Sequence, residues 1–162
     1  VFITYLEINE SIRNMITAIT KDICPALEKI AMQDIGAMYQ PDIREELDGI
    51  GTGKYFGFCA IENDKPVGYV IAKRTVNTYQ LMVIAIDKDH RNKGYGTLLV
   101  EAIFTEIQKQ GGRILNVITD ADANDSLRFY LKNGFVLTGI VQDEFISGVA
   151  QAHLTKRMGF NP

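Results

Sequence analysis

The chain has 162 residues, of which 46% are hydrophobic and 23% are charged, and its formal net charge is −3. This length suits one domain with a sizeable core, and the composition is ordinary for a globular protein. The small acidic excess excludes a generally basic nucleic-acid surface, and no apolar run approaches the length needed to cross a bilayer, so we expect no nucleic-acid or membrane partner.

The chain is predicted to begin with a strand and two helices. Residues 2–8 alternate well enough for a strand, and a helix is expected to begin at Asn9 or Ser11. Apolar side chains at helical spacing support that helix, namely Ile12, Met15, Ile16 and Ile19. A second helix is expected from Pro25, because proline is favoured in the first helical turn. The polar, glycine-rich residues 40–53 predict a loop with room for a short helix.

A hairpin and a central strand follow. Residues 54–61 and 67–75 are rich in β-branched and aromatic side chains, and residues 62–66 between them have the composition of a turn. Residues 78–87 contain an unbroken apolar run. Such a run predicts a strand buried on both faces, in the middle of a sheet.

The second half of the chain is predicted to alternate helices with strands. A long amphipathic helix begins at Tyr95 and ends at Gly111, and another begins with Asn124 as its N-cap and ends at Gly134. Strands are predicted at residues 113–119, 135–145 and 149–158. This order of elements predicts one α/β (α+β) domain over residues 1–162, built on a mixed sheet.

The most informative segment joins the apolar strand to the long helix. It reads Arg91-Asn92-Lys93-Gly94-Tyr95-Gly96. Glycines there allow backbone N–H groups to turn inward, and a helix N-terminus adds unpaired donors. The helix dipole contributes about 0.3–1 kcal/mol, whereas each charge-assisted hydrogen bond contributes about 1.5–3 kcal/mol. Converging amides are therefore expected to bind a phosphate or diphosphate, with a smaller contribution from the exposed Arg91 and Lys93 side chains.

Two other phosphate-binding designs fit less well. Residues 49–54 lack the GxxxxGK[ST] spacing, and Tyr55 stands where a serine or threonine would hold magnesium. Residues 91–96 do not form GxGxxG either, which argues against a dinucleotide fold. A nucleotide-binding, kinase-like protein is therefore disfavoured.

Two motifs resemble those of GNAT-type (Gcn5-related) N-acetyltransferases. The family signature [Q/R]-x-x-G-x-[G/A] follows the fourth strand, and its three fixed positions correspond to Arg91, Gly94 and Gly96. The second motif is an Asn, a Tyr six residues later and then Gly-Phe, and here it corresponds to Asn124, Tyr130, Gly134 and Phe135. The order of predicted elements agrees with the family over essentially the whole chain, although residues 9–53 match nothing distinctive.

The resemblance implies a single-domain acyl-CoA N-acyltransferase fold. Its sheet would be mixed, mostly antiparallel and of about seven strands, flanked by about four helices. It implies acetyl-CoA as donor and direct transfer of the acetyl group to a primary amine of a small molecule or peptide. A non-catalytic acyl-CoA-binding or regulatory module is the alternative. A homodimer formed through the final strands is a further possibility.

The resemblance also implies which residues hold the donor. The diphosphate would lie on the backbone amides of one segment: Arg91, Asn92, Lys93, Gly94, Tyr95, Gly96 and Thr97. The pantetheine arm would be hydrogen-bonded by the backbone of Ile84, Ala85 and Ile86, as if it were an extra strand. Asn124 and Ser126 would contact the cofactor, and Tyr130 would protonate the departing thiolate.

The sequence does not assign a general base. The family often has a glutamate on its fourth strand, but residues 81–86 contain none. Five other residues are candidates by chemical type only: Glu28, Glu62, His90, Glu144 and His153.

The cysteines and histidines predict no metal site. Cys24 and Cys59 occur in unrelated contexts, and the two histidines are isolated from each other. We expect reduced thiols, which are typical of a cytoplasmic protein.

Overall fold

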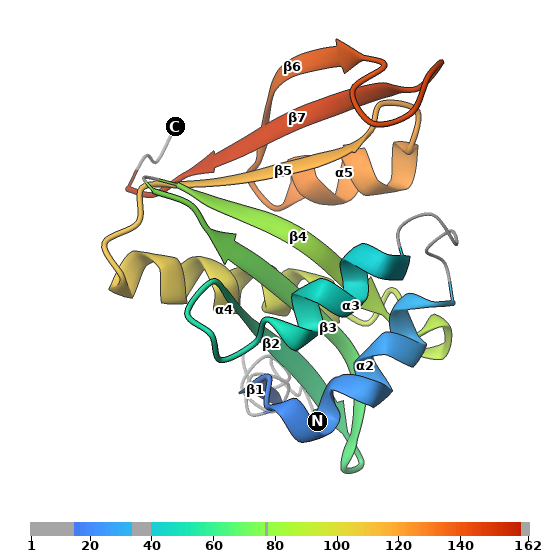
Figure 1. Ribbon diagram of the computed structural model, residues 1–162, viewed down its shortest axis with the longest axis vertical. Coiled ribbons are helices and arrows are strands. Elements are labelled where there is room, and N and C mark those ends of the chain that lie inside the picture. The colour runs from blue at the N-terminus through green and yellow to red at the C-terminus, as the bar shows by residue number, and fades with distance from the viewer. Residues whose placement is uncertain (1–14, 34–39, 77, 160–162) are drawn as a thin grey trace, which may run out of the picture. The chain divides into compact units, whose positions relative to one another are not determined.

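The structure is a computed structural model in which residues 15–33, 40–76 and 78–159 are described (Figure 1). The chain divides into two compact units. The first contains residues up to 73 together with 82–103, and the second contains residues 74–81 together with those from 104 onward.

The first unit holds the β2–β3 hairpin and the helices α2 and α3. The bounds of its elements are β1 Ile16–Ala18, α2 Cys24–Ala31, α3 Gln40–Asp48, β2 Tyr55–Glu62 and β3 Lys65–Arg74, followed by the second part of β4 Tyr79–Ile86. Glu62 pairs with Lys65 across a turn in which Asn63 and Asp64 have φ of 51° and 60°. Two left-handed residues are typical of tight hairpin turns, and the predicted hairpin is confirmed.

The core of the first unit lies where α2 and α3 pack near the sheet (Figure 1). Its buried side chains include Leu27, Ile30, Ile43, Leu47, Tyr69, Ile71 and Val83. Pro25 stands in the first turn of α2, as predicted, where its missing N–H leaves no helical hydrogen bond unmade.

One prediction for this unit needs correction. Ile16–Ala18 is a strand rather than part of a helix, and Ile16 pairs with Ala60 of β2. The predicted strand at residues 2–8 and the helix start at Asn9 or Ser11 lie outside the described residues. The short helix for which the predicted loop left room is present as α3, which occupies nine residues.

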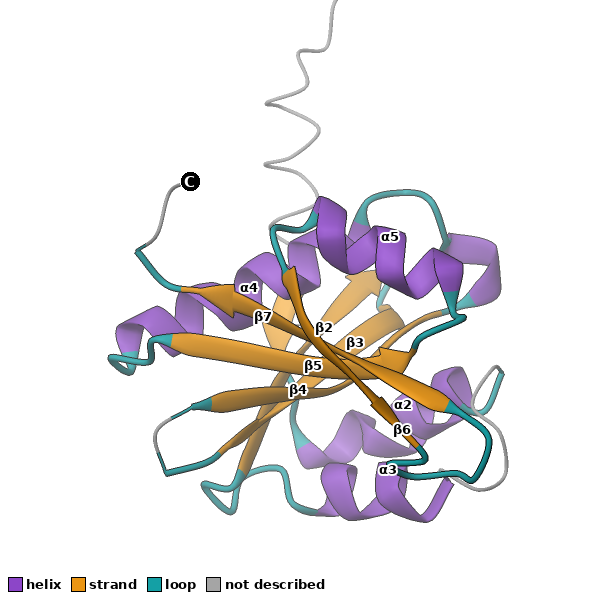
Figure 2. Ribbon diagram, turned by 90° about the horizontal axis from the view of Figure 1, so that it is seen from above, coloured by secondary structure: helices purple, strands orange, loops and turns teal. Residues whose placement is uncertain are grey.

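The second unit contains a short stretch of β4 and the last three strands. Its remaining elements are β5 Ile114–Asp120, α5 Asn124–Lys132, β6 Val136–Gln142 and β7 Ala150–Arg157, and it shares α4 Tyr95–Lys109 with the first unit. β4 pairs with β5 in parallel, whereas β7 runs antiparallel to both β5 and β6 (Figure 2). The full strand order is β1-β2-β3-β4-β5-β7-β6, which confirms a mixed seven-stranded sheet. None of the described helices is both long and apolar enough to span a membrane.

Two further predictions are corrected here. Asn124 is not the N-cap of α5, because Ala123 occupies that position without a side-chain hydrogen bond and the helix begins at Asn124. In β4, Tyr79, Leu81 and Val83 are buried but the alternate positions are only half-buried, so burial on both faces is incomplete.

Both cysteines are free thiols. Cys59 lies on β2 with no exposed surface, and burial raises the pKa of its thiol to about 11. Cys24 opens α2 and is half-buried, and burial is also the main reason why its pKa is raised.

Candidate functional site

The end of β4 presents backbone groups on the side away from β3. The Asp87 N–H donates to the Val67 carbonyl at 2.9 Å, across the β3–β4 pair. Because the polar groups of successive strand residues point to opposite edges, those of Ile86 and Ile84 point to the other edge. The Ile86 carbonyl accepts a hydrogen bond from Arg91 Nε there at 3.1 Å. Of the predicted pantetheine-binding residues, Ile84 and Ile86 thus have backbone groups that point away from β3, while those of Ala85 point toward β3.

The chain then makes a tight turn toward α4. A short 3-10 helix, η3 Lys88–His90, begins at Asp87, whose Oδ1 accepts from the Asp89 N–H at 3.1 Å. Asn92 and Gly94 have φ of 60° and 93°. Both lie in the left-handed region, which glycine enters without strain and asparagine tolerates.

The first turn of α4 leaves backbone donors unpaired. Gly94 is the N-cap, because its carbonyl accepts from the Leu98 N–H at 3.2 Å. The N–H groups of Tyr95, Gly96 and Thr97 precede the first N–H that donates within the helix, that of Leu98, and within the described part of the chain they have no backbone partner. Such a helix terminus binds anions such as phosphate groups.

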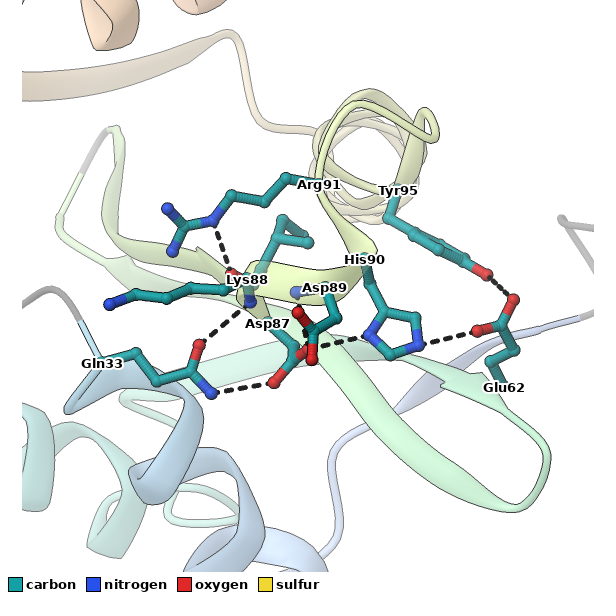
Figure 3. Close-up of polar contacts among 9 residues, drawn as sticks. Gln33, Glu62, Asp87, Lys88, Asp89, His90, Arg91 and Tyr95 are labelled. Carbon is teal, nitrogen blue, oxygen red and sulfur yellow. Dashed lines mark hydrogen bonds and ion pairs between the residues drawn. The ribbon is translucent and has the colours of Figure 1, made fainter.

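A polar network braces this turn (Figure 3). Tyr95 Oη donates to Glu62 Oε1 at 2.8 Å, and the other carboxylate oxygen of Glu62 lies 2.8 Å from His90 Nε2. His90 Nδ1 lies 2.8 Å from Asp87 Oδ1. Each imidazole nitrogen of His90 therefore faces a carboxylate oxygen. The network joins the end of β2, the end of β4 and the first residue of α4.

Gln33 extends the network beyond the end of α2. Its Nε2 donates to Asp87 Oδ2 at 2.8 Å, and its Oε1 accepts from the Lys88 N–H at 3.0 Å (Figure 3). Both ends of one amide side chain are thus used to hold the turn that leads to α4.

The electrostatics of the network keep its carboxylates ionised. The hydrogen bond from Tyr95 is the main reason why the pKa of Glu62 is lowered, and the hydrogen bond from Gln33 is the main reason why the pKa of Asp87 is lowered. Burial, followed by its bond to Glu62, raises the pKa of Tyr95 to about 12. At neutral pH the phenol therefore donates and the carboxylates accept.

Three predicted site residues, Asn124, Ser126 and Tyr130, belong to the second unit. Tyr130 is 7% exposed and packs edge-on between Phe129 and Phe135, with ring centroids 5.3 and 5.4 Å away. Burial raises the pKa of Tyr130 to about 12, so its hydroxyl is protonated at neutral pH. Asn124 is exposed and Ser126 is half-buried in the first turn of α5.

The glutamates named as candidate bases have partners of their own. Glu28 Oε1 accepts from Arg44 Nε at 2.7 Å, and Glu144 contacts His153. Glu62 and His90 bind each other in the network. Each of these groups thus has a role that the structure explains without catalysis.

Sequence reasoning missed Glu46 of α3. Glu46 is 4% exposed, and among the described residues neither its Oε2 nor the nearby Tyr69 Oη has a hydrogen-bond partner. Burial, followed by the charges of Asp42 and Glu45, raises the pKa of Glu46 to about 7. The signal was available: Glu46 falls on the apolar stripe of its helix, three residues after Ile43.

Comparisons with known proteins agree with this geometry. The profile of the acetyltransferase (GNAT) family matches residues 19–135. N-alpha-acetyltransferase 30 of Schizosaccharomyces pombe is 27% identical over 120 residues, which cover 71% of this chain and 76% of that protein. The ribosomal-protein-S18-alanine N-acetyltransferase of Escherichia coli has a TM-score of 0.77 at 18% identity, and the match covers 91% of this chain and 95% of that chain. Aminoglycoside 6'-N-acetyltransferase, solved with coenzyme A, has a TM-score of 0.73 at 16% identity and covers 91% and 98%.

Proposed function

Because the chain belongs to the GNAT family of acetyltransferases, we propose which of its residues hold the two substrates of the reaction. The protein is an N-acetyltransferase that uses acetyl-CoA as donor. The family match runs through parts of both units, which supports treating residues 1–162 as one acetyltransferase domain. Two free thiols support a reducing, cytoplasmic setting.

The turn before α4 binds the diphosphate of acetyl-CoA. The observation that carries this assignment is the set of open amides at Tyr95, Gly96 and Thr97, which follow a left-handed Gly94. A side chain at Gly94 would strain the turn, and the Glu62–His90–Asp87 bridge holds the turn in place before any ligand arrives. Preorganised donors bind an anion without first being ordered.

The edge of β4 that faces away from β3 binds the pantetheine arm. Backbone groups of Ile84 and Ile86 point away from β3, in the orientation that an added strand requires. The Ile86 carbonyl already accepts from Arg91, so Ile84 has the more accessible pair of groups. When bound, acetyl-CoA supplies an acetyl group activated as a thioester.

Tyr130 donates a proton to the departing thiolate. Its raised pKa keeps the hydroxyl protonated at every physiological pH, and its packing against two phenylalanines fixes the ring. General acid assistance of this kind contributes roughly 10²–10⁴-fold to a rate. Tyr130→Phe is therefore expected to lower kcat while leaving the affinity for acetyl-CoA nearly unchanged.

The acceptor is the α-amine at the N-terminus of a peptide or protein. The yeast relative is an N-alpha-acetyltransferase and is matched over most of its length. The chemistry agrees, because β4 has no glutamate to act as base. An α-amine with a pKa near 7.7–8.0 costs only about 1 kcal/mol to deprotonate at pH 7, whereas a lysine amine costs about 4–5 kcal/mol.

Calorimetry with two ligands tests the donor site. Acetyl-CoA is expected to bind on the order of 100-fold more tightly than S-acetylpantetheine, which has no diphosphate, because at least two charge-assisted hydrogen bonds are lost. Equal affinities would overturn the assignment of residues 91–97.

Matched peptides test the acceptor. Thiol release is expected with a lysine-free peptide that has a free α-amine, and not with an N-acetylated peptide that contains lysine. Mass spectrometry then locates the acetyl group. Acetylation of the lysine peptide alone would contradict the α-amine assignment and leave the donor site untouched.

A further inference from the structure

A small hollow lies in the second unit, where α4 ends and β5 begins (Figure 1). Its volume is about 180 Å³, which corresponds to roughly six water molecules at about 30 Å³ each. Its described lining comes from residues 74–76, Tyr79 and residues 110–113. Two of these lining residues are arginines, and none of them is acidic. We call the space between Arg74, Tyr79, Gln110 and Arg113 the arginine hollow.

The buried wall of the arginine hollow is held in place by packing and hydrogen bonds. Tyr79 is 4% exposed, and its Oη donates to Gln110 Oε1 at 3.0 Å. Gln110 Nε2 in turn donates to Glu106 Oε1 at 3.0 Å, so both ends of this amide are used. A Cβ at Gly112 would lie 2.5 Å from Tyr79 Cε2, which is closer than real side chains approach. The wall therefore has a defined shape before any ligand binds.

The guanidinium groups of the two arginines have no partner within the described part of the chain. Arg74 is the last residue of β3 and Arg113 directly precedes β5, and both residues are exposed. Neither side chain forms an ion pair or a hydrogen bond with another described residue. By contrast, Arg44 of α3 donates to Glu28 at 2.7 Å. The charges that line the arginine hollow are thus not explained by internal ion pairs.

The C-terminus of α4 does not require these arginines either. Cations are favourable near such an end, because the last helical carbonyls lack helical partners. Here backbone groups supply the partners: the Gly111 N–H donates to the Gln108 carbonyl at 3.0 Å, and the Gly112 N–H donates to the Ile107 carbonyl at 2.8 Å. With Gly111 at φ 73°, this pair of hydrogen bonds is a Schellman motif. The guanidinium groups are therefore not needed to cap these carbonyls.

Positive charge is concentrated at this end of the second unit. Lys109 ends α4, and Arg157, at the end of β7, lies opposite Ile114, the residue after Arg113. Both side chains belong to exposed residues. Together with the two arginines of the hollow they make four cations, whereas Glu106 offsets one charge. The whole chain has a net charge of −3, so this local excess is not a result of average composition. Such a concentration of one sign attracts the opposite charge.

We propose that the arginine hollow binds the phosphate group of a small phosphate monoester. A guanidinium presents a planar fork of N–H donors that matches two oxygens of a phosphate. Two arginines suit a group that carries a charge of about −1.5 to −2 at pH 7 better than they suit a singly charged carboxylate. The hollow is smaller than the roughly 300–1,000 Å³ of pockets that enclose a whole drug-sized ligand, so it admits the phosphate and few further atoms.

An NMR titration of the full chain with inorganic phosphate tests the proposal. Saturable shifts are expected at the amides of Gly111 and Gly112, and acetate at the same ionic strength is expected to shift them far less. The amides of Gly96 and Thr97 report on the proposed donor site in the same spectra, so the two sites are observed separately. Absence of saturable shifts at residues 111 and 112, or equal shifts with acetate, overturns the proposal.

Arginine substitutions locate the binding to the hollow. Arg74→Ala and Arg113→Ala are each expected to raise the dissociation constant for phosphate about tenfold, because each removes one fork of donors. Arg44→Ala is the matched control, since it removes an arginine whose side chain is 63% exposed and lies outside the hollow, and it is expected to change nothing. Circular dichroism checks that each variant is folded. An equal loss in the control, or an unchanged affinity in both hollow variants, overturns the proposal.

Discussion

Two polar clusters of the first unit differ in how they treat their carboxylates. In the turn before α4, both carboxylate oxygens of Glu62 and both of Asp87 have polar partners, and the pKa of each group is lowered. Under α3, Glu46 is more deeply buried, lacks a partner for Oε2, and has a raised pKa. Hydrogen bonds lower the pKa of the carboxyl groups in the turn, whereas burial raises the pKa of the Glu46 carboxyl.

The difference shows which cluster is built for a ligand. In the turn, the side chains of Glu62, His90 and Asp87 satisfy one another, and the amides of Tyr95, Gly96 and Thr97 have no backbone partner among the described residues, so these amides are expected to bind a ligand. The Glu46–Tyr69 cluster has unsatisfied atoms, but Glu46 and Tyr69 are only 4% and 0% exposed. Its effect is therefore expected in stability, whereas the effect of the turn is expected in binding.

Glu46→Gln is expected to produce the largest change in stability. The ordinary pKa of this carboxyl is 4.5 and the folded value is about 7, so folding is penalised increasingly as pH rises from about 4.5 to 7. The full penalty is on the order of 3 kcal/mol at 1.36 kcal/mol per unit. Urea unfolding at pH 8 should show the glutamine variant to be more stable than the wild type, and the two should converge near pH 4.

Tyr69→Phe separates ionisation from simple polarity in that cluster. It removes the other unpartnered buried atom without removing a charge, so any gain in stability should be about 1 kcal/mol and independent of pH. A Glu46→Gln variant that is no more stable than the wild type at pH 8 would show that ionising this buried carboxyl carries no penalty.

Gly94→Val is expected to weaken acetyl-CoA binding about tenfold, because a β-branched residue at φ 93° strains the turn by about 1–2 kcal/mol. Calorimetry with acetyl-CoA measures the loss. Gly53→Val is the matched control: Gly53 has φ 84° and, like Gly94, open space around its Cβ position. Loss of affinity in both variants would point to a general effect of strain rather than to the turn.

Glu62→Gln is expected to raise the KM for acetyl-CoA roughly threefold with less change in kcat, since one network bond is weakened and the amides remain. Steady-state kinetics at saturating acceptor measure the split. Glu45→Gln is the control, because Glu45, like Glu62, accepts from a tyrosine, here Tyr55; its second donor is Lys54, and both lie at the start of β2. A fall in kcat alone would contradict a role in holding the donor.

The smallest expected effect is on acid stability. Glu62 and Asp87 have folded pKa values below their ordinary 4.5 and 3.8, so the stability that they contribute is present above those values. It is lost as pH falls through the folded values. As pH falls from 5 to 3, the midpoint temperature of thermal unfolding should therefore fall less steeply in Glu62→Gln than in the wild type.

Features set by neighbouring residues were predictable from the sequence. The hairpin at residues 62–66, the left-handed Gly94 and the end of α5 at Gly134 each depend on a few adjacent residues. The same holds for the open first turn of α4, which needs only a strand, a glycine and a helix in succession. The backbone geometry that we propose for donor binding could therefore be predicted in advance.

Features set by distant partners were not predictable. Ile16–Ala18 has helical spacing but becomes a strand because it pairs with residues 58–60 of β2, far along the chain. The Glu62–His90–Asp87 bridge joins the ends of two strands, and nothing local to His90 indicates Glu62. Asparagine is a favoured N-cap residue, yet α5 begins at Asn124 itself, one residue too early for Asn124 to serve as the N-cap.

The unequal burial of the two thiols has a practical consequence for spectroscopy. Alkylating dyes require an accessible thiolate, so they should label Cys24 at the start of α2 and spare Cys59, whose pKa is about 11. A fluorophore can thus be attached at one defined place in the unaltered chain. Its emission would report on the environment of α2 during turnover without the need for a cysteine-free background.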